Sequence, residues 1–75
     1  MEGGGEMAGK MVEVEGFKAF RGVMIVKYIY DEVNDDVLTD VPIFGEWLYR
    51  PDTKCWYNKG VSYPEDFCNV LEVIW

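Results

Sequence analysis

The stretch Phe44–Tyr63, FGEWLYRPDTKCWYNKGVSY, decides the predicted fold. It holds six of the chain's twelve aromatic residues, on both sides of the turn sequence Pro51–Lys54, where proline suits the first turn position. A four-residue loop at this point predicts an antiparallel hairpin with Trp47, Tyr49 and Trp56 on one face. That face is either the core of a small β-domain or an exposed binding surface. The predicted cross-strand pairs are Arg50 with Cys55, Tyr49 with Trp56, Leu48 with Tyr57, and Trp47 with Asn58.

Alternating and β-branched patterns predict further strands on both sides of this hairpin. Val12–Glu15 sends valines to one face and glutamates to the other, and Gly22–Tyr30 is dominated by β-branched and aromatic residues. We expect Phe17–Arg21 to connect these two strands as a loop or a bulged bend. After a turn at Asn58–Gly60, the segment Val61–Tyr63 is expected to return as a short strand.

The segment after Pro64 predicts a short C-terminal helix, because its apolar residues recur at helical spacing: Phe67, Val70, Leu71 and Ile74. A terminal strand over Asn69–Trp75 is the alternative. The predicted fold is therefore mainly β (α+β), with four to five antiparallel strands in a small sheet or partly open barrel and a short helix at the end. We expect residues 11–75 to form this single domain and residues 1–10, which hold four glycines, to form a flexible tail.

Composition limits the classes of function. The 75 residues carry fourteen acidic and seven basic side chains, so the formal net charge is −7. Negative charge disfavours contact with a nucleic-acid backbone or an anionic membrane, and we expect neither as a partner. It can attract a basic surface on another protein. Without a predicted signal peptide or membrane-spanning run, the expected location is the cytoplasm.

The chain has no histidine, which removes the commonest general base and the commonest metal ligand. Cys55 and Cys68 alone cannot supply the four ligands of a structural zinc site. We expect them to be buried free thiols, with a bridge between them as the alternative. No phosphate-binding glycine loop or EF-hand pattern is present. We therefore predict that the protein is not an enzyme and has no cofactor and no metal site.

The first candidate binding surface is acidic. Asp31–Asp40 is predicted to be a loop without Lys or Arg, whose carboxylates would imitate a phosphate backbone and occupy a basic groove of a partner. The alternative is a loop that only keeps the domain soluble. The candidate residues of this surface are Asp31, Glu32, Asp35, Asp36, Asp40 and Glu46.

The second candidate surface is the aromatic hairpin with its neighbouring cations. Such a combination can stack a planar or anionic ligand or anchor a protein partner. The alternative is that its aromatic residues are core. The candidate residues of this surface are Trp47, Tyr49, Trp56, Tyr57, Arg50 and Lys54.

The run Gly45–Pro64, preceded by Val14–Phe20, resembles short uncharacterised proteins carried by bacterial phages and prophages, over most of residues 11–68. The resemblance implies a small, acidic, non-enzymatic protein that binds and inhibits a host protein, such as a component of a defence system, in the host cytoplasm. One alternative is an oligomeric sponge that sequesters an anionic or nucleotide-like molecule between Trp56, Tyr57 and Arg50 or Lys54. A further alternative is a structural subunit that self-associates through exposed strand edges.

Overall fold

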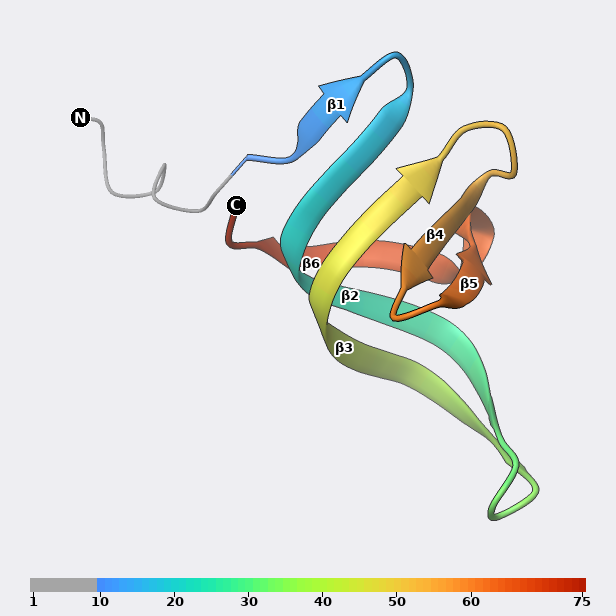
Figure 1. Cartoon of the computed structure of the whole chain (residues 1–75). Coiled ribbons are helices and arrows are strands. Elements are labelled where there is room, and N and C mark those ends of the chain that lie inside the picture. The colour runs from blue at the N-terminus through green and yellow to red at the C-terminus, as the bar shows by residue number, and fades with distance from the viewer. Residues whose placement is uncertain (1–9) are drawn as a thin grey trace.

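The computed structural model describes residues 10–75, whose strands form one curled antiparallel sheet (Figure 1). The strands in chain order are β1 (Val12–Val14), β2 (Phe17–Asp31), β3 (Asp36–Arg50), β4 (Cys55–Asn58), β5 (Val61–Pro64) and β6 (Cys68–Val73). The first five pair in chain order, whereas β6 returns to pair with β2. The predicted mainly β, antiparallel fold is confirmed. The predicted tail lies outside the described residues, except for Lys10.

The register of the β3–β4 hairpin agrees with three of the four predicted pairs; the ladder ends before the predicted pair of Trp47 with Asn58. Tyr49 pairs with Trp56, with Leu48 opposite Tyr57 on one side and Arg50 opposite Cys55 on the other. The backbone N–H of Lys54 donates to the Arg50 carbonyl over 2.8 Å and closes the loop. Loop length alone was therefore sufficient to predict which side chains share a face.

Two predicted interruptions are absent from the strands. Phe17–Arg21 belongs to β2, because the turn from β1 is made by Glu15 and Gly16, both with positive φ. The predicted acidic loop Asp31–Asp40 is mostly strand as well: β2 runs to Asp31 and β3 begins at Asp36. Acidic residues are poor strand formers by propensity, but here the pairing of the two long strands overrides it.

The predicted C-terminal helix is wrong. A 3-10 turn at Glu65–Phe67 leads into strand β6, and the alternative terminal strand is closer to the observed structure. The register of β6 against β2 shifts by one residue at Leu71, which is the extra residue of a β-bulge. Cys68, Val70 and Val73 pair with the core-facing Val26, Met24 and Gly22. The bulge interrupts the period-two alternation of the strand, so Val70, Leu71 and Ile74 fall at helical spacing from Phe67 although the segment is extended.

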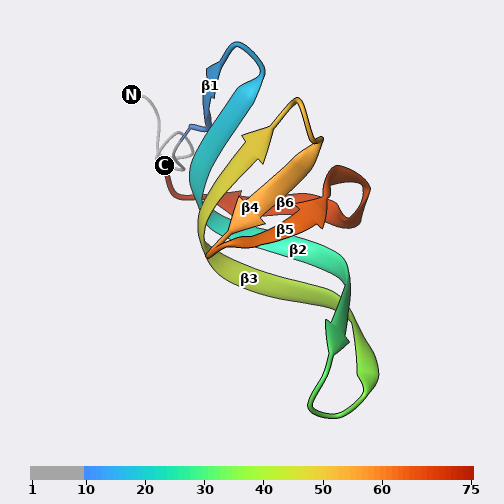
Figure 2. The same ribbon diagram turned by 45° about the vertical axis from the view of Figure 1, so that its right-hand side comes forward.

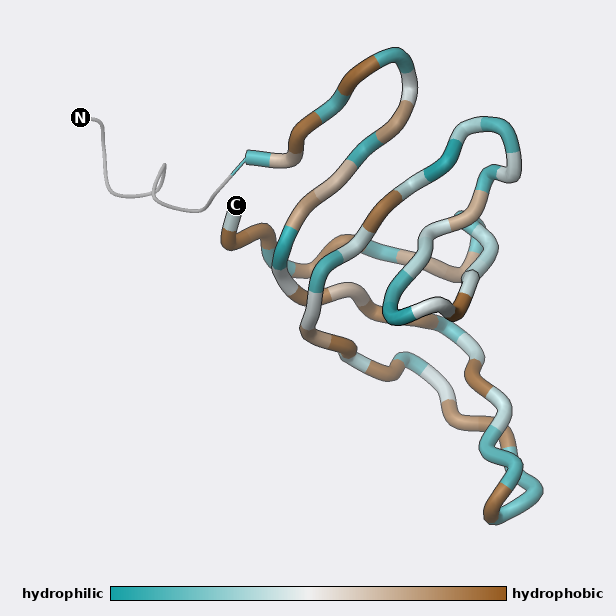
Figure 3. Tube along the Cα trace, in the orientation of Figure 1, coloured by the Kyte–Doolittle hydropathy of each residue, from teal (hydrophilic) through white to brown (hydrophobic). Residues whose placement is uncertain are grey.

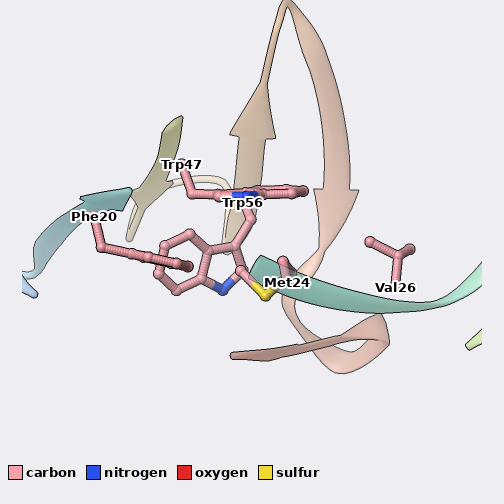
Figure 4. Packing of buried hydrophobic residues seen from close by; sticks show 5 residues of the cluster. All are labelled: Phe20, Met24, Val26, Trp47 and Trp56. Atoms are coloured by element: carbon pink, nitrogen blue, oxygen red, sulfur yellow. The ribbon is translucent and has the colours of Figure 1, made fainter. Parts of the chain in front are cut away.

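Buried side chains from β2, β3 and β4 form the core (Figure 4). They are Phe20, Met24, Val26, Trp47 and Trp56. The Phe20 and Trp56 rings meet edge to face, with centroids 5.5 Å apart, and Trp47 packs against Tyr63 with centroids 5.6 Å apart. Edge-to-face and tilted arrangements are the preferred geometries of aromatic pairs. The aromatic hairpin therefore contributes both of its tryptophans to the core.

The sheet curls because its two longest strands bend together (Figure 2). Gly22 of β2 pairs with Gly45 of β3 near the middle of each strand. A Cβ atom at Gly22 would lie 2.0 Å from the carbonyl oxygen of Glu72, so β6 approaches β2 more closely than any other residue would allow. At the start of β6, the Cys68 thiol donates to the Tyr63 carbonyl oxygen of β5, with the two atoms 3.9 Å apart.

Both cysteines are free thiols, and both are partly exposed rather than buried as predicted. Within residues 10–75 there is no helix long and apolar enough to cross a membrane.

Candidate functional site

Beyond the pair Val26–Val41, the β2–β3 hairpin projects from the body as a two-stranded arm, which we define as residues 27–40 (Figure 1). It makes the molecule elongated: the radius of gyration is 13.6 Å, against about 11 Å for a compact chain of this length. The arm carries five of the six predicted acidic site residues and a single base, Lys27. The arm is therefore the acidic surface predicted from the sequence, built as a ribbon instead of a loop.

Asp31 organises the tip of the arm. Its carboxylate accepts hydrogen bonds from the backbone N–H groups of Val33 and Asn34, at 3.0 and 3.4 Å, and from the Asn34 side-chain amide at 2.8 Å. This is the local bonding by which aspartate initiates turns. The Asn34 side chain and these backbone amides lower the pKa of Asp31. The carboxylate therefore stays charged at the tip and is committed to holding the turn.

Two further carboxylates are tied to the tip. Asp35 has a positive φ of 52° and accepts a hydrogen bond from the Tyr30 hydroxyl, which raises the pKa of that tyrosine. Asp36 accepts the backbone N–H of Val37 over 2.7 Å. Asp36 also stands opposite Asp31 in the ladder, a like-charge pair that opposes strand pairing. The local hydrogen bonds offset that repulsion.

The base of the arm is defined by a kink and an aromatic contact. Asp40 has a φ of 53° inside β3, and the ladder skips its position opposite Lys27. Aspartate tolerates this left-handed conformation better than most residues. On the other strand, the Tyr28 ring meets Phe67 of the 3-10 turn edge to face, with centroids 5.3 Å apart. The arm is thus attached to the body by packing as well as by the chain.

The arm is exposed along its length and carries apolar side chains among its carboxylates. Every residue from Glu32 to Asp40 is exposed, and Val33 at the tip retains 91% of its accessible surface. Figure 3 shows the mixture of hydrophilic and hydrophobic segments at this end of the molecule. The other large apolar or aromatic side chains exposed on the arm are Tyr28, Tyr30, Val37 and Leu38. These residues were not predicted as binding residues, although apolar and acidic residues alternate in this part of the sequence.

Glu46, the sixth predicted acidic residue, does not belong to the arm. It lies beyond the Gly22–Gly45 pair, opposite Arg21 in the register of β2 and β3. The Arg21 guanidinium itself lies over the Phe44 ring, 5.6 Å from its centroid. Glu46 therefore has a different environment from the five carboxylates of the arm.

The predicted aromatic surface is divided by the fold. Trp47 and Trp56 are 2% and 7% exposed, which leaves them inaccessible to a ligand. The Tyr49 hydroxyl donates to Glu65 over 2.7 Å, and this hydrogen bond raises the pKa of Tyr49. Arg50 is paired with Asp52 at 3.0 Å. These residues hold β3, β4 and the 3-10 turn together.

The last two residues of that set lie on the opposite side of the sheet or in the loop. Tyr57 is partly exposed, and its hydroxyl lies 3.0 Å from Thr53 Oγ1. Lys54 is exposed with a positive φ of 57°. The hairpin thus presents no aromatic cluster to solvent on the face that holds the tryptophans.

In the described part of the chain, no group of three or more His, Cys, Asp or Glu side chains is arranged to hold a metal ion. Comparison with protein-family models, with curated proteins and with solved structures gives no match.

Proposed function

We propose that this protein is a non-enzymatic binder that inserts its acidic arm into a basic groove of a partner protein and thereby inhibits it. The observation that carries the proposal is the projection of five carboxylates, with one lysine, on an exposed two-stranded ribbon. Complementary charge accelerates and orients such an encounter. A protein encoded by the host of a phage is the partner class that the resemblance implies, in the host cytoplasm.

Two properties of the arm support binding over a purely solubilising role. Its tip is held by the hydrogen bonds to Asp31, so little conformational entropy is lost when it docks. Val33 and the exposed tyrosines supply apolar contacts that a solubilising loop does not need. Carboxylates around an apolar tip fit a groove with a basic rim and an apolar floor.

The ligand-sequestering alternative has less support. Its site required an accessible Trp56 beside Arg50 or Lys54. Lys54 is exposed, but Trp56 is buried and Arg50 is paired with Asp52. A ligand could not stack on Trp56 without opening the core.

The test compares two variants that remove equal charge. The arm variant E32Q/D35N/D36N/D40N leaves Asp31 in place, because that residue holds the turn, and asparagine suits the left-handed positions 35 and 40. The control variant E13Q/E15Q/D66N/E72Q neutralises exposed carboxylates of the body. Tagged protein is first used to capture the partner from host extract, and binding is then measured with the purified partner by calorimetry at several salt concentrations.

We expect the arm variant to bind at least about ten-fold more weakly, and its affinity to depend less on salt than that of the wild type. The control variant should bind within about two-fold of the wild type. If both variants lose affinity equally, net charge and not the arm is responsible. If neither loses affinity, the arm is not the binding element.

A further inference from the structure

The face of the sheet that points away from the core carries a row of apolar residues across four strands. The register places Val12 of β1 beside Ala19, Ala19 beside Leu48, and Leu48 beside Tyr57 of β4. In the next row, Val14 pairs with Phe17. Because side chains alternate along a strand, residues two apart share a face, so both rows lie on the same surface. We call Val12, Val14, Phe17, Leu48, Tyr57 and Trp75 the outer patch.

Three residues of the outer patch, Leu48, Tyr57 and Trp75, line a hollow of about 380 Å³. Ala19, Phe20, Glu46 and Trp47 complete its lining. Trp75 is brought there because its backbone continues the pairing of β6 and exchanges hydrogen bonds with Arg21 at 2.7 and 3.3 Å. This face is therefore apolar and partly concave, as protein interfaces often are.

The patch is large enough to be the centre of a dimer interface. Val12, Val14, Phe17, Leu48 and Trp75 are between 41% and 61% exposed. At on the order of 150–200 Å² for a fully exposed large apolar side chain, these five offer roughly 400–500 Å². A standard interface buries about 800 Å² on each partner, and more than half of the interface core is apolar.

The outer patch carries few charges, so a second copy can cover it without burying unpaired charge. The chain carries a net charge of −7, so two copies would repel through the arms. Among the residues that line the hollow, Glu46 is the one charged side chain, and Arg21 stands next to it in the register. In a twofold interface, Arg21 of each copy would meet Glu46 of the other. The face also lies at the opposite end of the long hairpin from the arm, which stays free (Figure 1).

From these observations we infer that the protein forms a twofold symmetric homodimer through the outer patch. Burial of the patch adds apolar contacts to a core of five buried residues, which is small even for a chain of this size. The inference is independent of the proposed role of the arm.

The test is the mass of the full chain in solution. At about 100 µM, sedimentation equilibrium should give twice the monomer mass of 8.7 kDa. Leu48→Lys should raise the dissociation constant of the dimer at least about ten-fold, because it places a charge in the buried centre. Leu38→Lys is the matched control: both leucines are on β3 and both are 42% exposed. Leu38→Lys should leave the dimer intact.

Ala19→Lys, which fills the hollow, gives a second variant if Leu48→Lys fails to fold as judged by tryptophan fluorescence. It should also produce monomer. A wild-type protein that is monomeric at this concentration overturns the inference, as does a dimer that Leu38→Lys weakens as much as Leu48→Lys. If the arm variant E32Q/D35N/D36N/D40N keeps its partner affinity while the dimer is intact, that result counts against the arm alone.

Discussion

Replacement of Gly22 by alanine tests how the sheet closes. The added Cβ would lie 2.0 Å from the Glu72 carbonyl oxygen and 3.1 Å from the Cα of Val73. Both are backbone atoms, so no side-chain rotation relieves the contact. Strand β6 must move away from β2 by more than an ångström, and the pairs that Gly22 and Val23 make with Val73 and Glu72 weaken.

The expected cost follows from these losses. Overpacking against backbone costs about 1–3 kcal/mol, and each weakened backbone hydrogen bond about 0.5–1.5 kcal/mol. We therefore expect Gly22→Ala to lower the free energy of unfolding by about 3 kcal/mol. A chain of this length has about 4–11 kcal/mol in total. The corresponding decrease in Tm is roughly 12–24 °C.

The assay is urea unfolding followed by tryptophan fluorescence, since Trp47 and Trp56 are buried. Gly60→Ala is the matched control. Gly60 has a φ of +81° and no neighbour within 4 Å of an added Cβ, so its replacement costs only the strain of a left-handed alanine, about 1 kcal/mol. If Gly22→Ala is as stable as Gly60→Ala, β6 does not depend on this close approach and our account of the closure is wrong.

Two more predictions concern the body of the sheet. Asn58 is 6% exposed, and its side-chain amide donates to the Glu46 carbonyl over 3.0 Å. Asn58→Ala should lower the midpoint of urea unfolding by the equivalent of about 1–2 kcal/mol, with the dependence of the free energy on urea concentration unchanged. Replacement of the exposed Ser62 by alanine should not lower the midpoint. Burial raises the pKa of the Cys68 thiol to about 11 from an ordinary 9.0. The Cys68 thiol loses its proton at a higher pH in the folded state than in the unfolded chain. The stability that this thiol contributes is therefore complete below pH 9.0 and disappears as the pH rises to about 11. Over this pH range the free energy of unfolding should fall more steeply with pH for the wild type than for Cys68→Ala. Equal slopes would contradict the prediction.

The arm and the outer patch divide the surface between two kinds of contact. The arm offers charge at the far end of β2 and β3, whereas the patch offers apolar area at the other end of the same strands. If both proposals hold, one dimer carries two arms and can engage a partner with two equivalent basic grooves. Bivalent attachment would then strengthen binding without a new contact.

Local patterns in the sequence were sufficient to predict the β3–β4 hairpin and the β character of the chain. Turn length sets the pairing of Tyr49 with Trp56, and side-chain alternation then assigns each residue to a face. The same patterns located the carboxylates of the arm within Asp31–Asp40. They did not show that this segment is paired strand, because its propensity is that of a loop.

Which face of the hairpin is buried was decided only by the tertiary structure. Both faces of β3 and β4 carry large apolar residues, so the local pattern allows either face to be the buried one. The return of β6 to Gly22 curls the sheet over Trp47 and Trp56 and leaves Leu48 on the exposed face. The bulge at Leu71 has the same origin, because a strand that follows a bent partner must add a residue to stay paired. Local pattern therefore determined the β3–β4 hairpin and its register. Long-range closure determined that Phe17–Arg21, Asp36–Asp40 and Cys68–Val73 are paired strand, which aromatic residues are core and which surfaces remain for binding.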